Sequence, residues 1–308
     1  MNALDRLLLL FLILPLACHG AVLSYGLVSL NGQGDMPVSD WDAVGRGDRL
    51  YIAPFDAVEP SGVTVSGGSS KTVFRAYVGR SGSYQGNLDV VGENSYFATI
   101  DSMYIGYGNA GGRLNVSDGA HVHSGEHALI GAFGVGSVVV DNATFSTVGG
   151  LSMNRAGCSL RIVNGGRVSV GYYFGMGNGD SGVIDIVDGS LAVDFLSNQN
   201  GNSLSISLGS GGALALENSN GTEGVSEFMA VNRGTIELLV WNGSRYRPYQ
   251  DLVEGVDYLV QPGTGELVGY GVLTSLHPVP EQSAFAMIFG LMGLVIAMLR
   301  RKRCSGEK

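Results

Sequence analysis

The feature that most constrains this chain is an internal repeat of 20 to 26 residues that runs through its middle. When the chain is aligned on one apolar position, the same pattern returns at intervals of 25, 26, 24, 22, 24 and 20 residues. Two positions later, every row again carries a valine or an isoleucine. This alternation is typical of a β-strand with one buried face, because successive side chains point to opposite sides. The aligned positions are Val63, Leu88, Leu114, Val138, Leu160, Ile184 and Leu204.

Each row continues into turn residues four positions after the alignment point. Asp and Asn tolerate a left-handed backbone, and glycine adopts positive φ without steric cost. The extended pattern then resumes, and several rows close on a glycine-rich segment such as Ile105 to Gly108. The repeat therefore consists of strands and turns alone. The clearest turn pairs are Asp118-Gly119, Asn142-Ala143, Asn164-Gly165 and Asp188-Gly189.

A repeat of this size cannot bury its own apolar face and has to stack on its neighbours. We therefore predict an all-β fold, a right-handed parallel β-helix (solenoid) of about seven coils, with Val and Ile inside. At about 4.8 Å per coil, seven rows make a rod of roughly 34 Å. An antiparallel β-sandwich of short hairpins is the alternative, because the turn pairs also suit hairpins. The similarity between whole rows favours the solenoid.

The composition agrees with a turn-rich β protein. The 308 residues include 49 glycines, 45% hydrophobic and only 15% charged residues, too apolar for disorder and too rich in glycine for a helical protein. Between Ala21 and Leu299, 25 Asp and Glu stand against 12 Lys and Arg, a net charge of −13. A surface of this sign repels nucleic acid and anionic polysaccharide. We expect no nucleic-acid partner.

The N-terminus has the form of a secretory signal. Arg6 precedes an apolar run from Leu7 to Leu16, and small residues follow up to Gly20. These features predict a signal peptide over residues 1–20, and Cys18 offers a lipoprotein cleavage site as a minor alternative. Only Cys158 then remains in the exported body, so an intrachain disulfide there is excluded.

The C-terminal segment predicts a short membrane span. Sixteen uncharged residues, Ala284 to Leu299, precede a basic cluster. A helix of this length rises about 24 Å against roughly 30 Å of hydrocarbon, so flanking arginines and local thinning have to cover the difference. The positive-inside rule places the cluster in the cytoplasm and the body outside it. We assign the anchor to Ala284, Phe285, Leu291 and Leu299, and the stop-transfer cluster to Arg300, Arg301, Lys302 and Arg303.

The tail resembles the PEP-CTERM sorting signal, in which a Pro-Glu-Pro motif precedes a short transmembrane helix and a basic cluster. Val279, Pro280 and Glu281 match the motif, and Gln282 stands where the second proline is usual. The resemblance implies an exported bacterial protein, anchored in the membrane and then processed by an exosortase, a membrane cysteine transpeptidase. It also implies a final place at the cell surface or outside the cell, with extracellular polysaccharide as a further partner. The repeats resemble, in composition, those of autotransporter-like surface proteins.

These patterns divide the chain into seven segments. An open sheet edge at each end of a solenoid needs a cap, which we assign to the segments that flank the repeats. We predict a signal peptide (1–20), an N-terminal cap (21–60), the β-helix repeats (61–226), a C-terminal β cap or small β module (227–276), a linker with the sorting motif (277–283), a transmembrane helix (284–299) and a basic cytoplasmic tail (300–308).

The histidines His121, His123 and His127 form the most suggestive cluster of potential metal ligands. The first two alternate on one predicted strand. The inward positions of that strand fall to Ala120 and Val122, which places both histidines on the solvated outer face without a converging third ligand. We therefore predict no metal site here.

Two short motifs are better explained as turns than as sites. Gly179-Asp180-Ser181-Gly182 resembles the segment around the nucleophile of chymotrypsin-like proteases, but Val183 replaces the next glycine and the segment falls between two rows. Gly177 to Asp185 resembles one copy of a calcium-binding nonapeptide repeat, whose sites need ligands from successive turns. We predict no cofactor, and a structural calcium ion is the one possibility left open.

Because β-helices host polysaccharide lyases and glycoside hydrolases, an exported carbohydrate-active enzyme is the alternative function. Such catalysis needs clustered carboxylates or a basic residue beside calcium. The candidates are Asp185, Asp188 and Asp194, with Arg161 and Arg167 one row earlier. Turn propensity explains the regular Asp spacing, and fold analogy does not establish activity. We therefore predict no catalytic residues, and a noncatalytic structural or adhesive component of the cell surface or the exopolysaccharide matrix.

Overall fold

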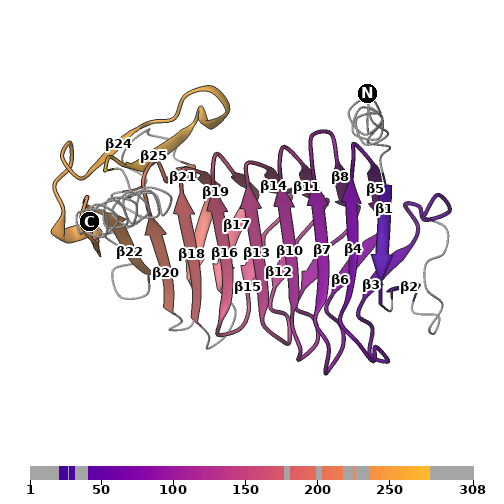
Figure 1. The fold of residues 1–308 in the computed structure, drawn as a ribbon. Coiled ribbons are helices and arrows are strands. Elements are labelled where there is room, and N and C mark those ends of the chain that lie inside the picture. The colour runs from indigo at the N-terminus through magenta and orange to yellow at the C-terminus, as the bar shows by residue number, and fades with distance from the viewer. Residues whose placement is uncertain are drawn as a thin grey trace, which may run out of the picture.

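The computed structural model describes residues 21–26, 28–31, 41–176, 181–198, 203–217, 225 and 236–277. Through this part the chain forms an all-β solenoid of about seven turns. Its strands stack in chain order along one axis (Figure 1). The predicted signal peptide and C-terminal anchor lie outside the described residues.

Three parallel ladders form the sides of the solenoid. Ladder one contains β4 (Ser61–Ser66), β7 (Gly86–Val91), β10 (Gly112–Ser117), β13 (Gly136–Asp141), β16 (Cys158–Val163), β18 (Ser181–Val187) and β20 (Ser203–Leu208). Ladder two contains β5 (Ser70–Val73), β8 (Tyr96–Thr99), β11 (His121–Ser124), β14 (Thr144–Thr147), the first parts of β17 (Arg167–Met176) and β19 (Ser190–Asn198), and β21 (Ala213–Glu217). Ladder three contains β3 (Arg49–Ile52), β6 (Arg75–Val78), β9 (Met103–Ile105), β12 (Ala128–Ile130), β15 (Leu151–Met153) and the second parts of β17 and β19.

Strands of opposite direction lie at both ends of the ladders. At the N-terminal end, β1 (Ala21–Tyr25) pairs antiparallel with β4, and β2 (Val28–Leu30) pairs antiparallel with β3. At the other end, β22 (Ile236–Trp241) extends ladder one and pairs antiparallel with β23 (Tyr246–Pro248), before the 3₁₀ turn η1 (Tyr249–Asp251). A hairpin of β24 (Tyr258–Pro262) and β25 (Tyr270–Ser275), which includes the 3₁₀ turn η2 (Gly265–Leu267), pairs antiparallel with β21. Figure 1 shows this hairpin beside the last coils.

The strand register confirms the predicted alignment for six rows and corrects the seventh. Each aligned residue from Val63 to Ile184 pairs directly with its counterpart in the next coil. In the last coil, however, Leu204 pairs with Gly182 and Ile206 pairs with Ile184. The predicted register of this row was therefore wrong by two residues. A slip of two leaves the same face inward, so apolar alternation alone does not distinguish the two registers.

The corner between ladders one and two uses the predicted turn residues. The residue at one turn position has a φ between 47° and 92° in each of six successive coils. The backbones of these turns also bond to one another; for example, the Asn142 amide donates to the Val163 carbonyl at 3.1 Å. The turn prediction is confirmed. The residues of this column are Gly67, Gly92, Asp118, Asn142, Asn164 and Asp188.

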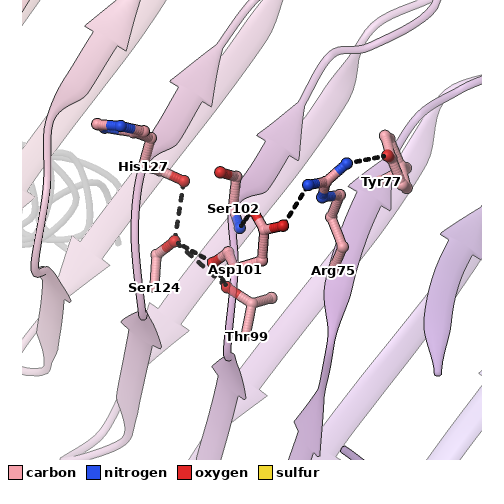
Figure 2. Close-up of polar contacts among 7 residues, drawn as sticks. All are labelled: Arg75, Tyr77, Thr99, Asp101, Ser102, Ser124 and His127. Atoms are coloured by element: carbon pink, nitrogen blue, oxygen red, sulfur yellow. Dashed lines mark hydrogen bonds and ion pairs between the residues drawn. The ribbon is translucent and has the colours of Figure 1, made fainter. Parts of the chain in front are cut away.

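The corner between ladders two and three contains buried hydroxyls (Figure 2). Thr99 donates to the Asp101 carbonyl at 2.8 Å, and Ser124 donates to the His127 carbonyl at 2.9 Å. The two hydroxyl oxygens are 3.2 Å apart. Since an unpaired buried carbonyl is costly, these side chains satisfy the backbone where the ladder is interrupted.

The core is a single column of apolar side chains inside the three ladders. On ladder two, successive coils place Phe97, Val122, Phe145 and Val168 in one register position, and all four are buried. The smaller valines separate the phenylalanine rings, so neighbouring coils interdigitate without overpacking.

Candidate functional site

The candidate site is a cleft of about 690 Å³ between the outer face of ladder two and the C-terminal hairpin. Its floor comes from β11, β14, β17 and β19, and its roof comes from η2 and the start of β25. The lining residues are His121, Thr144, Arg167, Val168, Ser169, Ser190, Ala192, Thr264, Gly265, Glu266, Leu267 and Tyr270.

The floor of the cleft is a row of polar side chains, His121, Thr144, Arg167 and Ser190, which we call the polar row. These residues pair directly with one another across four adjacent parallel strands. Outward positions that share a register form a line parallel to the solenoid axis, with a step of about 4.8 Å per coil. The row therefore offers an imidazole, two hydroxyls and a guanidinium to a molecule that lies along the axis.

The roof is tied to the floor by two side-chain contacts. Arg167 Nη1 lies 2.5 Å from Glu266 Oε2, and the Tyr270 hydroxyl donates to Asp194 Oδ1 at 2.8 Å. The loop between them closes on itself, because the Gly263 amide donates to the Tyr270 carbonyl at 2.7 Å. The hairpin thus covers the row with a preformed loop.

The two contacts differ in strength. Burial and the hydrogen bond to Asp194 raise the pKa of Tyr270 to about 12, so its hydroxyl stays a neutral donor at physiological pH. The side chains of Arg167 and Glu266 are 59% and 81% exposed, and exposed ion pairs contribute only about 0 to 1 kcal/mol. Arg167 and Glu266 can therefore separate and bond to a ligand at little cost.

The carboxylates proposed from the sequence as a catalytic group do not come together. Asp185 lies on ladder one, with Arg161 at 3.6 Å, and burial raises its pKa although Arg161 opposes this. Asp188 forms the corner turn, and Asp194 accepts from Tyr270. Among the five acids and arginines of that hypothesis, only Arg167 lines the cleft.

The side chains that line the cleft supply hydrogen-bond donors and acceptors. Among the described residues that line it, Glu266 is the only carboxylate. Glycoside hydrolysis ordinarily uses two carboxyl groups that flank the bond to be cleaved. The lining instead combines donors and acceptors on a rigid sheet, an arrangement typical of binding.

The histidines occupy the faces predicted for them. Ala120 and Val122 are buried, and His121 faces the cleft. His123 Nδ1 lies 2.9 Å from Ser146 Oγ, whereas His127 Nδ1 accepts from the Gly150 amide at 2.8 Å. Their partners differ, and in the part of the chain that the structure describes no three His, Cys, Asp or Glu side chains are grouped as metal ligands.

Most of the cleft was not predicted from the sequence. The polar row had a signal, since His121, Thr144, Arg167 and Ser190 are spaced by 23 residues each. No signal in the sequence pointed to Glu266, because it lies 99 residues from Arg167 and only the fold of the hairpin brings the two together.

Several predicted residues lie outside the described residues. These include the sorting motif Val279, Pro280 and Glu281, the whole anchor with its basic cluster, and the Gly179-Asp180 half of the Gly179-Asp180-Ser181-Gly182 segment. Ser181 and Gly182 begin β18. Across the described ranges, the structure contains no helix with the length and hydropathy of a membrane span.

Comparisons of the chain with protein-family models, with curated proteins and with solved structures return no match.

Proposed function

We propose that this chain is a noncatalytic structural or adhesive component of a bacterial cell surface or of its exopolysaccharide matrix. The observation that carries the proposal is the polar row, which lies along the axis of a regular solenoid under a preformed loop. An extended polymer that lies in the cleft meets one polar side chain per coil. The continuous backbone ladders supply a rod that resists bending and presents this cleft.

Export and sorting belong to the same proposal. Residues 1–20 act as a signal peptide, and the tail from Val279 to Arg303 holds the body outside the cytoplasm until an exosortase processes it. The right-handed winding of the coils and the two terminal helices are parts of this proposal.

Binding without turnover is the test of the proposed role. The purified full chain, in detergent, is titrated with a panel of soluble polysaccharides, and new chain ends are assayed in the same samples. We expect binding that weakens about tenfold in Arg167→Gln, which removes a charged hydrogen-bond donor from the floor, and no new ends. Arg113→Gln, at an exposed position on ladder one, is the matched control.

The alternative function is an exported polysaccharide lyase or glycoside hydrolase, for which the cleft itself is the favouring observation. Release of new chain ends by the parent, lost in Glu266→Gln, would overturn the noncatalytic proposal. Unchanged binding in Arg167→Gln would show that the polar row is not the binding surface.

Processing of the tail needs a separate experiment. The tagged chain is expressed with an exosortase, and its size and membrane association are compared with those of a Pro280→Ala, Glu281→Ala double variant. We expect the parent to be shortened and released and the variant to stay full-length in the membrane. Identical sizes and unchanged membrane association in parent and variant would contradict exosortase processing.

A further inference from the structure

Ladder three carries a stack of aromatic rings on its outer face, far along the chain from the cleft. Tyr51, Tyr77 and Tyr104 share one register position in three adjacent strands. Their ring centroids are 4.8 and 4.9 Å apart and their planes are within 7° of parallel. Because the step between coils is about the stacking distance of aromatic rings, the register alone imposes this stack. The rings cover one another's faces and form a rigid wall.

A second row, beside this wall, lies in the turns that follow ladder three. Phe55, Arg80, Tyr107 and Phe133 come from four successive turns, and we call them the aromatic-arginine row. Tyr107 packs edge-on against Phe133 with centroids 5.0 Å apart. Phe55 is 62% exposed and Phe133 is 54% exposed, so both ends of the row present large rings to solvent.

Arg80 stands in the middle of this row among aromatic rings. Its guanidinium carbon lies 4.5 Å from the ring centre of Tyr51, 4.7 Å from that of Phe55 and 5.8 Å from that of Tyr107. These cation–π contacts hold the guanidinium in one place and reduce its contact with water. Its Nε is buried without a hydrogen-bond partner, and no carboxylate of the described residues forms an ion pair with it.

Two arginines near this row form no ion pair with a described carboxylate. Asp101 is bonded to Arg75, whose other nitrogen donates to the Tyr77 hydroxyl at 3.4 Å (Figure 2). Arg49 pairs with Arg75 in register and is exposed. Neither Arg49 nor Arg80 forms an ion pair with a carboxylate of the described residues. Asp56, next to Phe55, is exposed, and Arg80 remains the cation at the centre of the row that has no ion pair with a described carboxylate.

We propose that the aromatic-arginine row binds an acidic polysaccharide, of the uronic acid class, laid along the solenoid axis. The apolar face of a pyranose ring packs on exposed Phe55 and Phe133, while the sugar carboxylate bonds to the planar fork of Arg80. The net charge of −9 repels an acidic polymer from surfaces that have no exposed cation, which favours binding at this row. The assignment deepens the proposed matrix role and rests on it for the biological source of the polymer.

The test uses polygalacturonate oligomers as the acidic probe and dextran oligomers as the neutral one. We expect the full chain to bind polygalacturonate more tightly than dextran, with an affinity that falls as salt rises. Arg80→Gln should weaken binding about tenfold or more, because it removes a hydrogen bond between charged groups. Phe133→Ala should weaken it several-fold, and Arg113→Gln, a distant exposed arginine on ladder one, should leave it unchanged.

Further variants separate binding from folding. Arg80→Lys keeps the charge without the fork, and Phe133→Ala removes an exposed ring, so these two decide the matter if Arg80→Gln does not fold. Equal affinity for both polymers, or full affinity in Phe133→Ala and Arg80→Lys, overturns the proposal. The cleft variant Arg167→Gln and the tail variants act at other residues, so failure here is distinguishable from failure of the proposed function.

Discussion

The corner between ladders two and three is built differently in the middle coils and in the later coils. In three successive coils Thr99, Ser124 and Thr147 occupy one inward position, and each hydroxyl bonds to a carbonyl just beyond the strand. In the next two coils that position holds Val170 and Val193. There β17 and β19 run through the corner as single strands.

The difference shows what the hydroxyls contribute at the corner of the middle coils. A hydroxyl can satisfy a carbonyl that leaves the ladder, and the strand can then stop. A valine cannot. In the coils of Val170 and Val193 the backbone continues to pair, and β17 does so with a shift of register between Val170 and Tyr173. In the first coil, however, β5 stops at Val73, which holds the same position. A solenoid of uniform coils therefore contains two ways of turning the same corner.

The largest effect should come from the corner between ladders three and one, where early and later coils also differ. Gly79 has a φ of 72°, and a Cβ there would lie 1.8 Å from the Gly111 carbonyl oxygen. Gly79→Ala should lower the free energy of unfolding by about 3 kcal/mol through strain and overlap. Asn154→Ala, in the equivalent turn of a later coil without positive φ, should change it by less than about 0.5 kcal/mol. Urea unfolding measures the loss of stability in both variants. Similar losses would show that the positive φ of Gly79 does not set the early turn apart from the later one.

The next effect tests the hydroxyl corner itself. Ser124 is fully buried and bonds to the carbonyls of Asp101 and His127. Ser124→Ala removes this buried donor, although the Asp101 carbonyl still accepts from Thr99 and the His127 carbonyl from the Met103 amide. The loss of the hydrogen bond should cost about 1.5 kcal/mol in the same unfolding experiment. Ser169→Ala, an exposed position on β17, is the control and should be close to neutral. If Ser124→Ala leaves the free energy of unfolding unchanged, the buried hydroxyls do not stabilise this corner.

A smaller effect is expected at the first corner. Asn142 has a φ of 47°. Asn142→Ala should destabilise the chain by about 1 kcal/mol, because alanine is strained in the left-handed region. Asn142→Gly, which has no such strain, should unfold at nearly the urea midpoint of the parent. If alanine and glycine behave alike, side-chain bonding rather than φ governs this column.

The free energy of unfolding should also depend on pH through Asp101, which forms an ion pair with Arg75. Burial acts to raise the pKa of Asp101, but hydrogen bonds from Arg75 and Ser102 outweigh it, so the pKa is lowered. A carboxyl with a lowered folded-state pKa stabilises the fold above its unfolded pKa of about 3.9, and this contribution is lost as the pH falls through the folded value. Unfolding free energies of parent and Asp101→Asn should therefore differ most near neutral pH and converge in acid. A constant difference across this range would contradict the ion pair's role.

The sequence by itself determined the repeat, the inward face of each strand and the residues of the first corner. These are local properties, since alternation of period two marks a buried face and only a few residues tolerate positive φ. Alternation alone assigns Val65 to the inside of a strand, and turn chemistry alone assigns Asn164 to a corner. The even spacing of the polar row is also a property of the sequence, although it does not by itself indicate a cleft.

Only the tertiary structure decided the register of the last coil, the roof of the cleft and the aromatic stack. Leu204 and Ile206 both face inward, so alternation could not choose between them, and backbone pairing with β18 did. Glu266 reaches Arg167 only because β25 reverses against β21. Tyr51, Tyr77 and Tyr104 become one stack because three coils lie in register, and contacts between coils depend on how the chain winds in space.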